Sequence, residues 1–266
     1  MTAWLVHAFT ATGAVLAYMA VEATIAGDTR LAFVWLVIAT LVDAVDGLLA
    51  RLARVKERTP HFNGARLDDI VDYLTFVFVP VFILRHDGLL PVGASGLAAA
   101  AAVLLSSAYG FSREDAKTSD HFFTGFPSYW NIVAVYMVAI QLSPLMNAAI
   151  LWGFVVLVFV PIGYVYPSRT PRWQRATVTL GALWAIALVV IIWRLPDAPR
   201  ELVWASLLYP IYYFTLSFVL HAQRTAAIPP RPPPGPNWLS SSSRNSSSFI
   251  TKRNDPSMAA ITSHTA

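Results

Sequence analysis

The chain has 266 residues, of which 56% are hydrophobic and only 13% are charged. A soluble domain of this size carries about 25% charged residues, so we expect much of the surface to face lipid instead of water. The formal net charge of +4 does not indicate a nucleic-acid partner, because the basic residues sort by membrane side and do not cluster on one element. The absence of cysteine excludes disulfides and thiolate metal sites.

Eight apolar segments approach the roughly 20 residues that a helix needs to cross a bilayer. In chain order they are residues 4–26, 31–50, 67–84, 92–111, 128–142, 146–166, 176–194 and 201–221. The sequence therefore predicts an all-α, polytopic transmembrane helix bundle of about eight spans over residues 1–224, with a polar active-site cavity open to the cytoplasmic side. Residues 225–266 are rich in proline and serine and cannot bury enough apolar area to fold, so we expect a disordered cytoplasmic tail.

Lysine and arginine are distributed unequally between the two sets of loops. With both termini on one side, that side carries fifteen of the nineteen basic residues, and the other side carries Arg30, Arg85, Arg194 and Arg200. Because cytoplasmic loops are enriched in basic residues, both termini are predicted to be cytoplasmic. The first segment lacks the pattern of a cleaved signal peptide, so we expect it to remain in the chain as a span.

Four aspartates lie within the second and third segments at helical spacing. Asp43, Asp46, Gly47 and Ala50 share one helix face, and Gly64, Asp68 and Asp72 share a face of the next helix. An ionised aspartate inside a span costs about 2.5–3.5 kcal/mol, and four that face one another would also repel. Divalent cations with oxygen ligands remove this difficulty. The four aspartates are therefore predicted metal ligands, and Arg51 is placed to pair with phosphate oxygens.

The spacing Asp43-x2-Asp46-Gly47-x2-Ala50-Arg51-x12-Gly64-x3-Asp68-x3-Asp72 resembles the signature of the CDP-alcohol phosphotransferase family. Most members have about eight or nine residues between the arginine and the second glycine. The twelve found here match the bacterial phosphatidylcholine synthase branch, which the stretches Gly125–Asn131 and Tyr164–Pro171 also resemble. The likeness covers about residues 1–224.

The resemblance implies transfer of a phosphatidyl group from CDP-diacylglycerol to an alcohol, choline in this branch, with release of CMP. Two divalent cations, Mn²⁺ before Mg²⁺, would be held by Asp43, Asp46 and Asp68. Asp72 would act as general base, with its own metal ligation left open. Gly47, Ala50, Arg51 and Gly64 would contact the CDP moiety, and Thr10 and His7 lie near where the family contacts the nucleotide. Other implied features are a bacterial inner-membrane location, lipid contacts and, as an open alternative, a homodimer.

A quaternary ammonium is recognised by the faces of aromatic rings, and the cytoplasmic side of the chain offers several. We assign choline binding to Tyr129, Trp130, Tyr164 and Tyr166 on this basis. Two alternatives stay open. A phosphorylated acceptor such as inositol phosphate or glycerol phosphate would need a basic pocket, for which Arg113, Lys117, Arg169 and Arg172 are candidates, and serine is a third acceptor. Intramembrane carboxylates also mark ion-coupled transporters.

Overall fold

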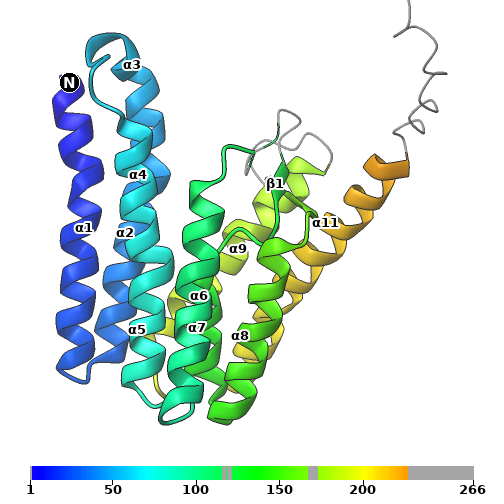
Figure 1. The fold of residues 1–266 in the computed structure, drawn as a ribbon. Helices are drawn as coiled ribbons and strands as arrows, with labels where there is room; N and C mark the ends of the chain where they lie inside the picture. Colours follow the sequence, from blue (N-terminus) through cyan, green and yellow to red (C-terminus); the bar gives the residue numbers. More distant parts are fainter. Residues whose placement is uncertain (1, 116–117, 119–121, 167–172, 227–266) are drawn as a thin grey trace, which may run out of the picture. The chain divides into compact units, whose positions relative to one another are not determined.

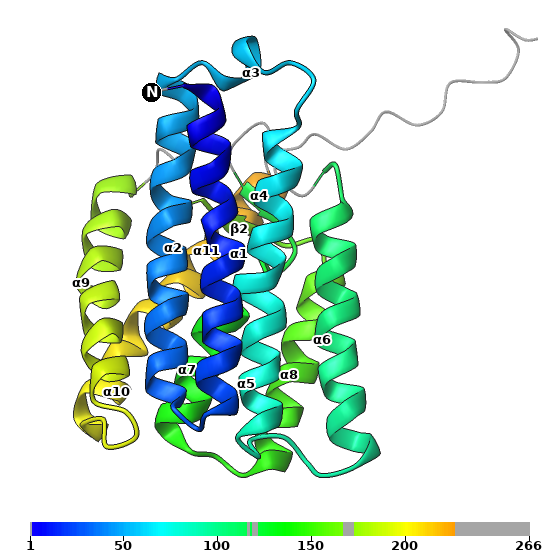
Figure 2. The same cartoon turned by 90° about the vertical axis from the view of Figure 1, so that its left-hand side faces the viewer.

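The computed structural model describes residues 2–115, 118, 122–166 and 173–226. These residues form one compact unit that ends near Ala227. All but a few residues of the predicted tail lie outside the described part of the chain, and the last helix continues to Ala226, two residues past the predicted boundary. Helices run up and down the unit in succession (Figures 1 and 2), as expected for an all-α bundle.

Each of the eight predicted segments contains helix. The elements are α1 (Ala3–Ile25), α2 (Thr29–Leu52), α3 (Val55–Arg58), α4 (Gly64–Asp72), the π-helical turn η1 (Tyr73–Phe78), α5 (Val79–His86), α6 (Ala94–Ser112), α7 (Trp130–Ile140), α8 (Pro144–Phe159), α9 (Gln174–Trp193), α10 (Arg200–Ser206) and α11 (Leu208–Ala226). Among the described residues, five stretches are long and apolar enough to cross a membrane: α1, α2, α6, α9 and Arg200–Ala226. The other three predicted segments are shorter, as in α7 and α8, or divided, as in α4–η1–α5.

The helix ends are set by local capping. Asp28 begins α2 by accepting a hydrogen bond from the Leu31 amide at 2.9 Å, and Asn63 begins α4 by accepting one from the Arg66 amide at 3.1 Å. Ser143 caps α8, and Pro144 occupies its first turn, where a missing amide hydrogen costs nothing. These caps place the breaks between helices close to where the charge and turn residues predict them.

One predicted boundary is wrong. The segment 146–166 was expected to be a single span, but α8 ends at Phe159, and Gly163–Val165 forms a short strand, β2. It pairs antiparallel with β1 (Phe122–Thr124). Pro161 removes a backbone donor just after α8, and Gly125, at φ +84°, follows β1 with the Val158 carbonyl against the place where a Cβ would be. The apolar composition of this stretch does not distinguish a buried strand from a helix.

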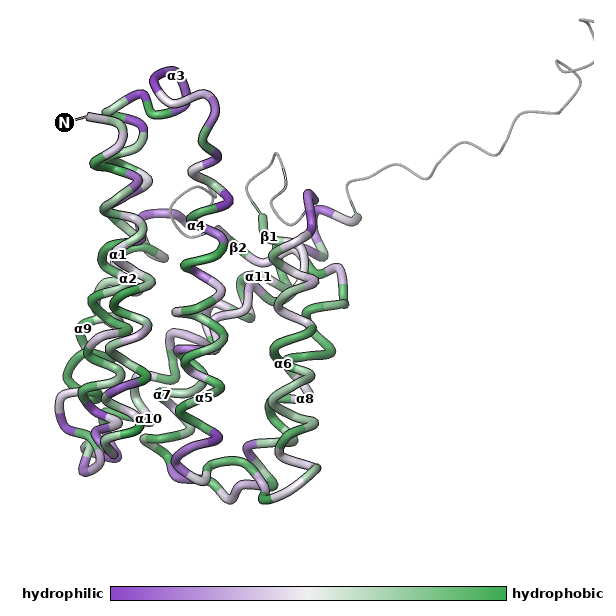
Figure 3. The backbone as a smooth tube through the Cα atoms, turned by 60° about the vertical axis from the view of Figure 1, so that its left-hand side comes forward, coloured by the Kyte–Doolittle hydropathy of each residue, from purple (hydrophilic) through white to green (hydrophobic). Residues whose placement is uncertain are grey.

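The chain reverses direction so that the N-terminus, α3, the β1–β2 pair and the C-terminal end of α11 lie at the same end of the bundle (Figures 1 and 2). Figure 3 shows hydrophilic residues along α3 and α4 and at the helix ends, with mainly hydrophobic stretches between them. Many large apolar side chains on the outside are exposed, such as Leu105 at 72% and Ile186 at 62%. An apolar exterior of this kind suits a lipid environment.

Candidate active site

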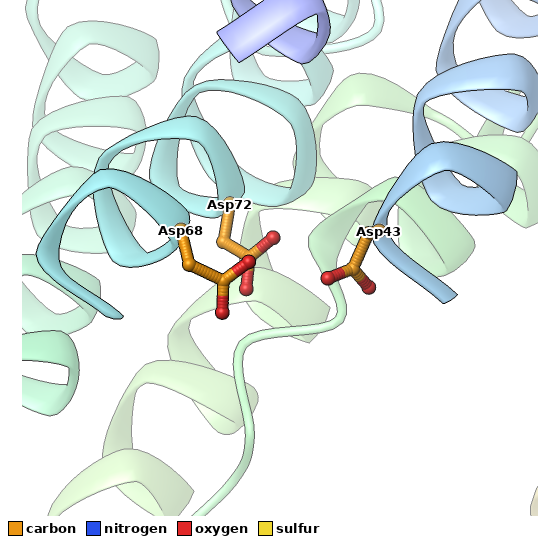
Figure 4. Close-up of side chains that lie close together, drawn as sticks. All are labelled: Asp43, Asp68 and Asp72. Atoms are coloured by element: carbon orange, nitrogen blue, oxygen red, sulfur yellow. The ribbon is translucent and has the colours of Figure 1, made fainter. Parts of the chain in front are cut away.

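Three of the four motif aspartates come together between two helices. Asp43 projects from α2, and Asp68 and Asp72 project toward it from α4 (Figure 4). One carboxylate oxygen from each lies within 4.8 Å of the others, and all three side chains are half-buried. The i, i+4 spacing on α4 places Asp68 and Asp72 one above the other on the same face. The predicted convergence of α2 and α4 is therefore confirmed for these three residues.

The helix that carries two of these aspartates changes its geometry directly after the site. Residues 64–72 are α-helical, and Tyr73–Phe78 forms the wider π turn. Single π turns often occur next to functional groups. Here the hydroxyl of Tyr73 donates to the Leu104 carbonyl of α6 at 3.0 Å, which anchors the turn.

Asp46 is buried, with 6% of its surface exposed. It lies one turn beyond Asp43 on α2 but is not part of the group of three, so its role as a ligand remains a prediction. Arg51 follows on the same helix, and its guanidinium Nη1 lies 3.6 Å from the place where a Cβ of Gly47 would be. A Cβ at this position would make an ordinary van der Waals contact with Arg51, so packing within the protein does not require the glycine. Ala50 packs against a small apolar cluster of α1 and the α2–α3 connection.

Gly64 has a structural neighbour that the sequence did not identify. A Cβ at this position would meet the imidazole of His7 on α1, with Cε1 at 2.7 Å and Nδ1 at 3.1 Å. The ring of His7 is buried, lies 4.3 Å from that of Phe62, and its Nε2 is 3.0 Å from the hydroxyl of Thr59. That hydroxyl itself donates to the Val55 carbonyl, so Nε2 of His7 carries the proton. The contact ties α1 to the start of α4.

Thr10, the other residue expected near the nucleotide, is buried and donates its hydroxyl to the Val6 carbonyl within α1 at 3.3 Å. Gly13, one turn further along α1, faces Val71 of α4 so closely that a Cβ would clash with its Cγ1. This crossing could not be predicted from the sequence, because a lone glycine in an apolar helix has many explanations. It brings α1 against the residue that precedes Asp72.

The four aromatic residues assigned to choline fall into two groups. Trp130 is buried, and its indole Nε1 donates to the Ser107 hydroxyl at 2.7 Å. Tyr164 is also fully buried, among the rings of Phe126, Tyr213, Phe214 and Phe218. Tyr129 and Tyr166 are half-buried. The ring of Tyr129 lies 6.5 Å from that of Phe76, in the π turn that follows Asp72, and the ring of Tyr166 lies 4.8 Å from that of Phe123.

The basic pocket for a phosphorylated acceptor receives no support from its one described member. Arg113 makes two hydrogen bonds of 2.8 Å to the carboxylate of Asp115, and these bonds lower the pKa of Asp115. Lys117, Arg169 and Arg172 lie outside the described residues. A polar cavity at the carboxylates also remains a prediction. An apolar cavity lies elsewhere in the described part of the chain, among α7, α8, α9 and α11.

Comparison with known proteins agrees with this geometry. The family described as CDP-alcohol phosphatidyltransferase matches residues 4–161, a range that holds all four motif aspartates. A phosphatidylcholine synthase of Legionella pneumophila is 40% identical over 223 residues, which cover 81% of this chain and 87% of the relative. For that of Pseudomonas aeruginosa, identity is 37%, with 74% and 83% covered. For that of Borreliella burgdorferi, it is 33%, with 84% and 95% covered. A match over more than half of the chain, with facing carboxylates on the motif helices, shows that the chain belongs to the CDP-alcohol phosphatidyltransferase family.

Proposed function

We propose that this protein is a phosphatidylcholine synthase, which transfers the phosphatidyl group of CDP-diacylglycerol to the hydroxyl of choline and releases CMP. The observation that carries the proposal is the meeting of Asp43, Asp68 and Asp72 within 4.8 Å on the two helices of the family motif. The choice of choline rests on the relatives, whose printed name is phosphatidylcholine synthase. It also rests on Tyr129, an aromatic ring that lies 6.5 Å from that of Phe76, in the π turn that follows Asp72.

The carboxylate group suits a hard divalent cation. Oxygen ligands on opposite sides of Mg²⁺ lie roughly 4 Å apart, so oxygens spread over 4.8 Å need only small side-chain rotations to share an ion. We propose Asp43 and Asp68 from this group, together with Asp46 of α2, as ligands of two divalent cations, Mn²⁺ before Mg²⁺. Asp72, the third member of the group, is left to accept a proton. When bound, such ions neutralise the negative charge of the pyrophosphate and of the leaving CMP.

The protein groups have separate parts in the proposed reaction. Arg51, at the end of the motif on α2, pairs with donor phosphate oxygens. Asp72 accepts the proton of the choline hydroxyl as that oxygen attacks the phosphorus of the phosphatidyl group. A new P–O bond forms to choline, and the bond from that phosphorus to the bridging oxygen of CMP breaks. Asp72 lies at the α4–η1 junction, one turn after Asp68.

Among the four aromatic candidates for choline, Tyr129 and Tyr166 are the ones we propose to contact the trimethylammonium group. Both are half-buried, and the ring of Tyr166 lies 4.8 Å from that of Phe123. We propose that Trp130 and Tyr164 support the choline site without contacting choline, because protein encloses their rings. Cation–π contacts of this kind are worth about 0.5–2 kcal/mol each.

We propose that the chain lies in a bacterial inner membrane, with α3 and both ends of the described unit on the cytoplasmic side. The four helices that can cross by themselves, together with the α10–α11 stretch, support insertion, and the excess of lysine and arginine at that end supports the orientation. The arrangement brings the carboxylates within reach of choline and CMP in the cytoplasm.

The identity of the acceptor is tested by comparing several alcohols. Membranes that contain the protein receive CDP-diacylglycerol, Mn²⁺ and one labelled alcohol at a time: choline, serine, glycerol phosphate or inositol phosphate. We expect a labelled lipid only with choline. A labelled lipid from another alcohol, with none from choline, would overturn the choice of acceptor and leave the family membership intact.

A further inference from the structure

A cavity of about 380 Å³ lies within the second half of the bundle. Its walls come from α7, α8, α9, the start of α11 and the turn before α7, and none of the residues that line it is charged. This volume lies in the range of ligand sites in proteins, which are typically concave and apolar. The cavity is therefore large enough to hold part of a substrate.

The polar tips of its tyrosines are held by the surrounding protein. The hydroxyl of Tyr136 is hydrogen bonded to Ser206 and to the indole of Trp184, each at 2.9 Å. Tyr209 donates to the Thr177 carbonyl at 3.3 Å, and Tyr213 donates to the Val165 carbonyl at 3.0 Å. Because these hydroxyls have partners in the protein, the cavity offers ring surfaces and aliphatic side chains to whatever occupies it.

One end of the cavity lies near the motif helix. Tyr129 lines the cavity, and its ring lies 6.5 Å from that of Phe76, in the π turn that directly follows Asp72. Ile140, which lines it as well, is at the other end of the 11-residue helix α7, about 16 Å away at the rise of an α-helix. One leaflet of a bilayer has about 15 Å of hydrocarbon. The cavity thus follows α7 over a length similar to that of one acyl chain.

We propose that this cavity binds one acyl chain of the diacyl lipid donor, with the glycerol end of the lipid at Tyr129 and the methyl end near Ile140. The inference rests on the proposed function, in which the donor is CDP-diacylglycerol. Choline is a less suitable occupant, because its trimethylammonium group needs ring faces only close to the reacting hydroxyl and would leave most of the length of the cavity empty. Ile140 of α7 and Ile150 of α8 add aliphatic side chains to the lining.

Two measurements test the proposal on the full-length protein in lipid nanodiscs. The first uses CDP-diacylglycerol with a diazirine at the end of one acyl chain, without acceptor, and maps the cross-linked peptides by mass spectrometry. The second compares CMP release from dioleoyl and dioctanoyl CDP-diacylglycerol. The variants are Ile140→Phe and Ile150→Phe, which enlarge two side chains of the cavity lining, one on α7 and one on α8. The control is Ile186→Phe, the same exchange at an exposed position of α9 that does not line the cavity.

We expect cross-links in α7 near Ile140 and in α8 near Ile150. Each of the two variants should lose activity with the dioleoyl donor about fourfold more than with the dioctanoyl donor, because the added volume of phenylalanine over isoleucine excludes about one methylene group. The control should show the same ratio of CMP release from the two donors as the unchanged protein. Cross-links confined to the outer helix faces, or variants equally active or equally impaired with both donors, would overturn the proposal. Cross-linking needs no acceptor, so failure of choline as substrate would leave this result unchanged.

Discussion

Replacement of Gly64 by alanine separates two explanations for the second glycine of the motif. The resemblance to the family implies that Gly64 leaves space for the CDP moiety. The structure shows another neighbour, because a Cβ at Gly64 would lie 2.7 Å from Cε1 of His7. That imidazole is enclosed by Phe62 and Trp4 and lies in hydrogen-bond contact with Thr59. The ring therefore cannot move away without the loss of other contacts.

The cost of the substitution can be estimated from these contacts. Overpacking by one methyl group costs about 1–3 kcal/mol, and loss of the His7–Thr59 hydrogen bond costs about 1 kcal/mol. Gly64→Ala should then destabilise the protein by about 2–4 kcal/mol and displace the start of α4, which carries Asp68. In a chain that already has His7→Ala, the same substitution should cost less than about 1 kcal/mol, since the ring that it meets is absent.

The assay is a double-mutant cycle of thermal stability in detergent, accompanied by CDP-diacylglycerol binding. If His7 is the reason for the glycine, the double variant binds the donor nearly as well as His7→Ala does. If donor binding falls by the same factor in both backgrounds, while stability shows no coupling, Gly64 is small for the ligand and the packing explanation is wrong.

Three further predictions concern neighbouring parts of the site. Gly13→Ala should lower the rate of CMP release at least tenfold, because the new methyl group displaces Val71 and with it Asp72. Val71→Ala in the same chain should restore most of the rate. A lack of rescue would show that the effect of Gly13 does not pass through Val71. Trp130→Phe should lower stability by about 1–3 kcal/mol through the lost hydrogen bond to Ser107 and leave KM for choline unchanged. Tyr129→Ala should raise KM for choline about tenfold. The reverse pattern would show that Trp130, and not Tyr129, contacts choline. Asp43→Asn and Asp68→Asn should raise the Mn²⁺ concentration for half-maximal rate more than tenfold. The control is Asp69→Asn, because Asp69 follows Asp68 on α4 but points about 100° away from the face that carries Asp68 and Asp72. Equal metal dependence in all three variants would contradict the ligand set.

The sequence predicts the site better than the packing around it. Helical spacing alone places Asp43, Asp68 and Asp72 on facing surfaces, because a short connection makes consecutive helices antiparallel neighbours. The chain belongs to a family of phosphatidyltransferases, and this membership decides against the alternative that the carboxylates belong to an ion-coupled transporter. The roles of His7 and Val71 could not be predicted, since contacts between α1 and α4 depend on the crossing of helices far apart in the sequence.

The aromatic residues show a second limit of sequence reasoning. Tyr129 and Trp130 are adjacent in the chain, yet one lies near Phe76 in the π turn that follows Asp72, and the other is 1% exposed and bonded to Ser107. Composition marks both as candidates for a cation site, but only the direction of the side chain separates them. The short strand Gly163–Val165 was missed for a similar reason, because its apolar residues continue the pattern of α8.

The central claim is that Asp72 activates choline for attack on CDP-diacylglycerol. Its most direct measurement is the yield of labelled phosphatidylcholine per CMP released by the purified protein and by Asp72→Asn, together with donor binding by both. We predict one phosphatidylcholine per CMP for the unchanged protein, and for Asp72→Asn a rate at least a thousandfold lower, on the order of the contribution of a general base, with donor affinity retained. CMP release without phosphatidylcholine, or a near-normal rate for Asp72→Asn, would contradict the account.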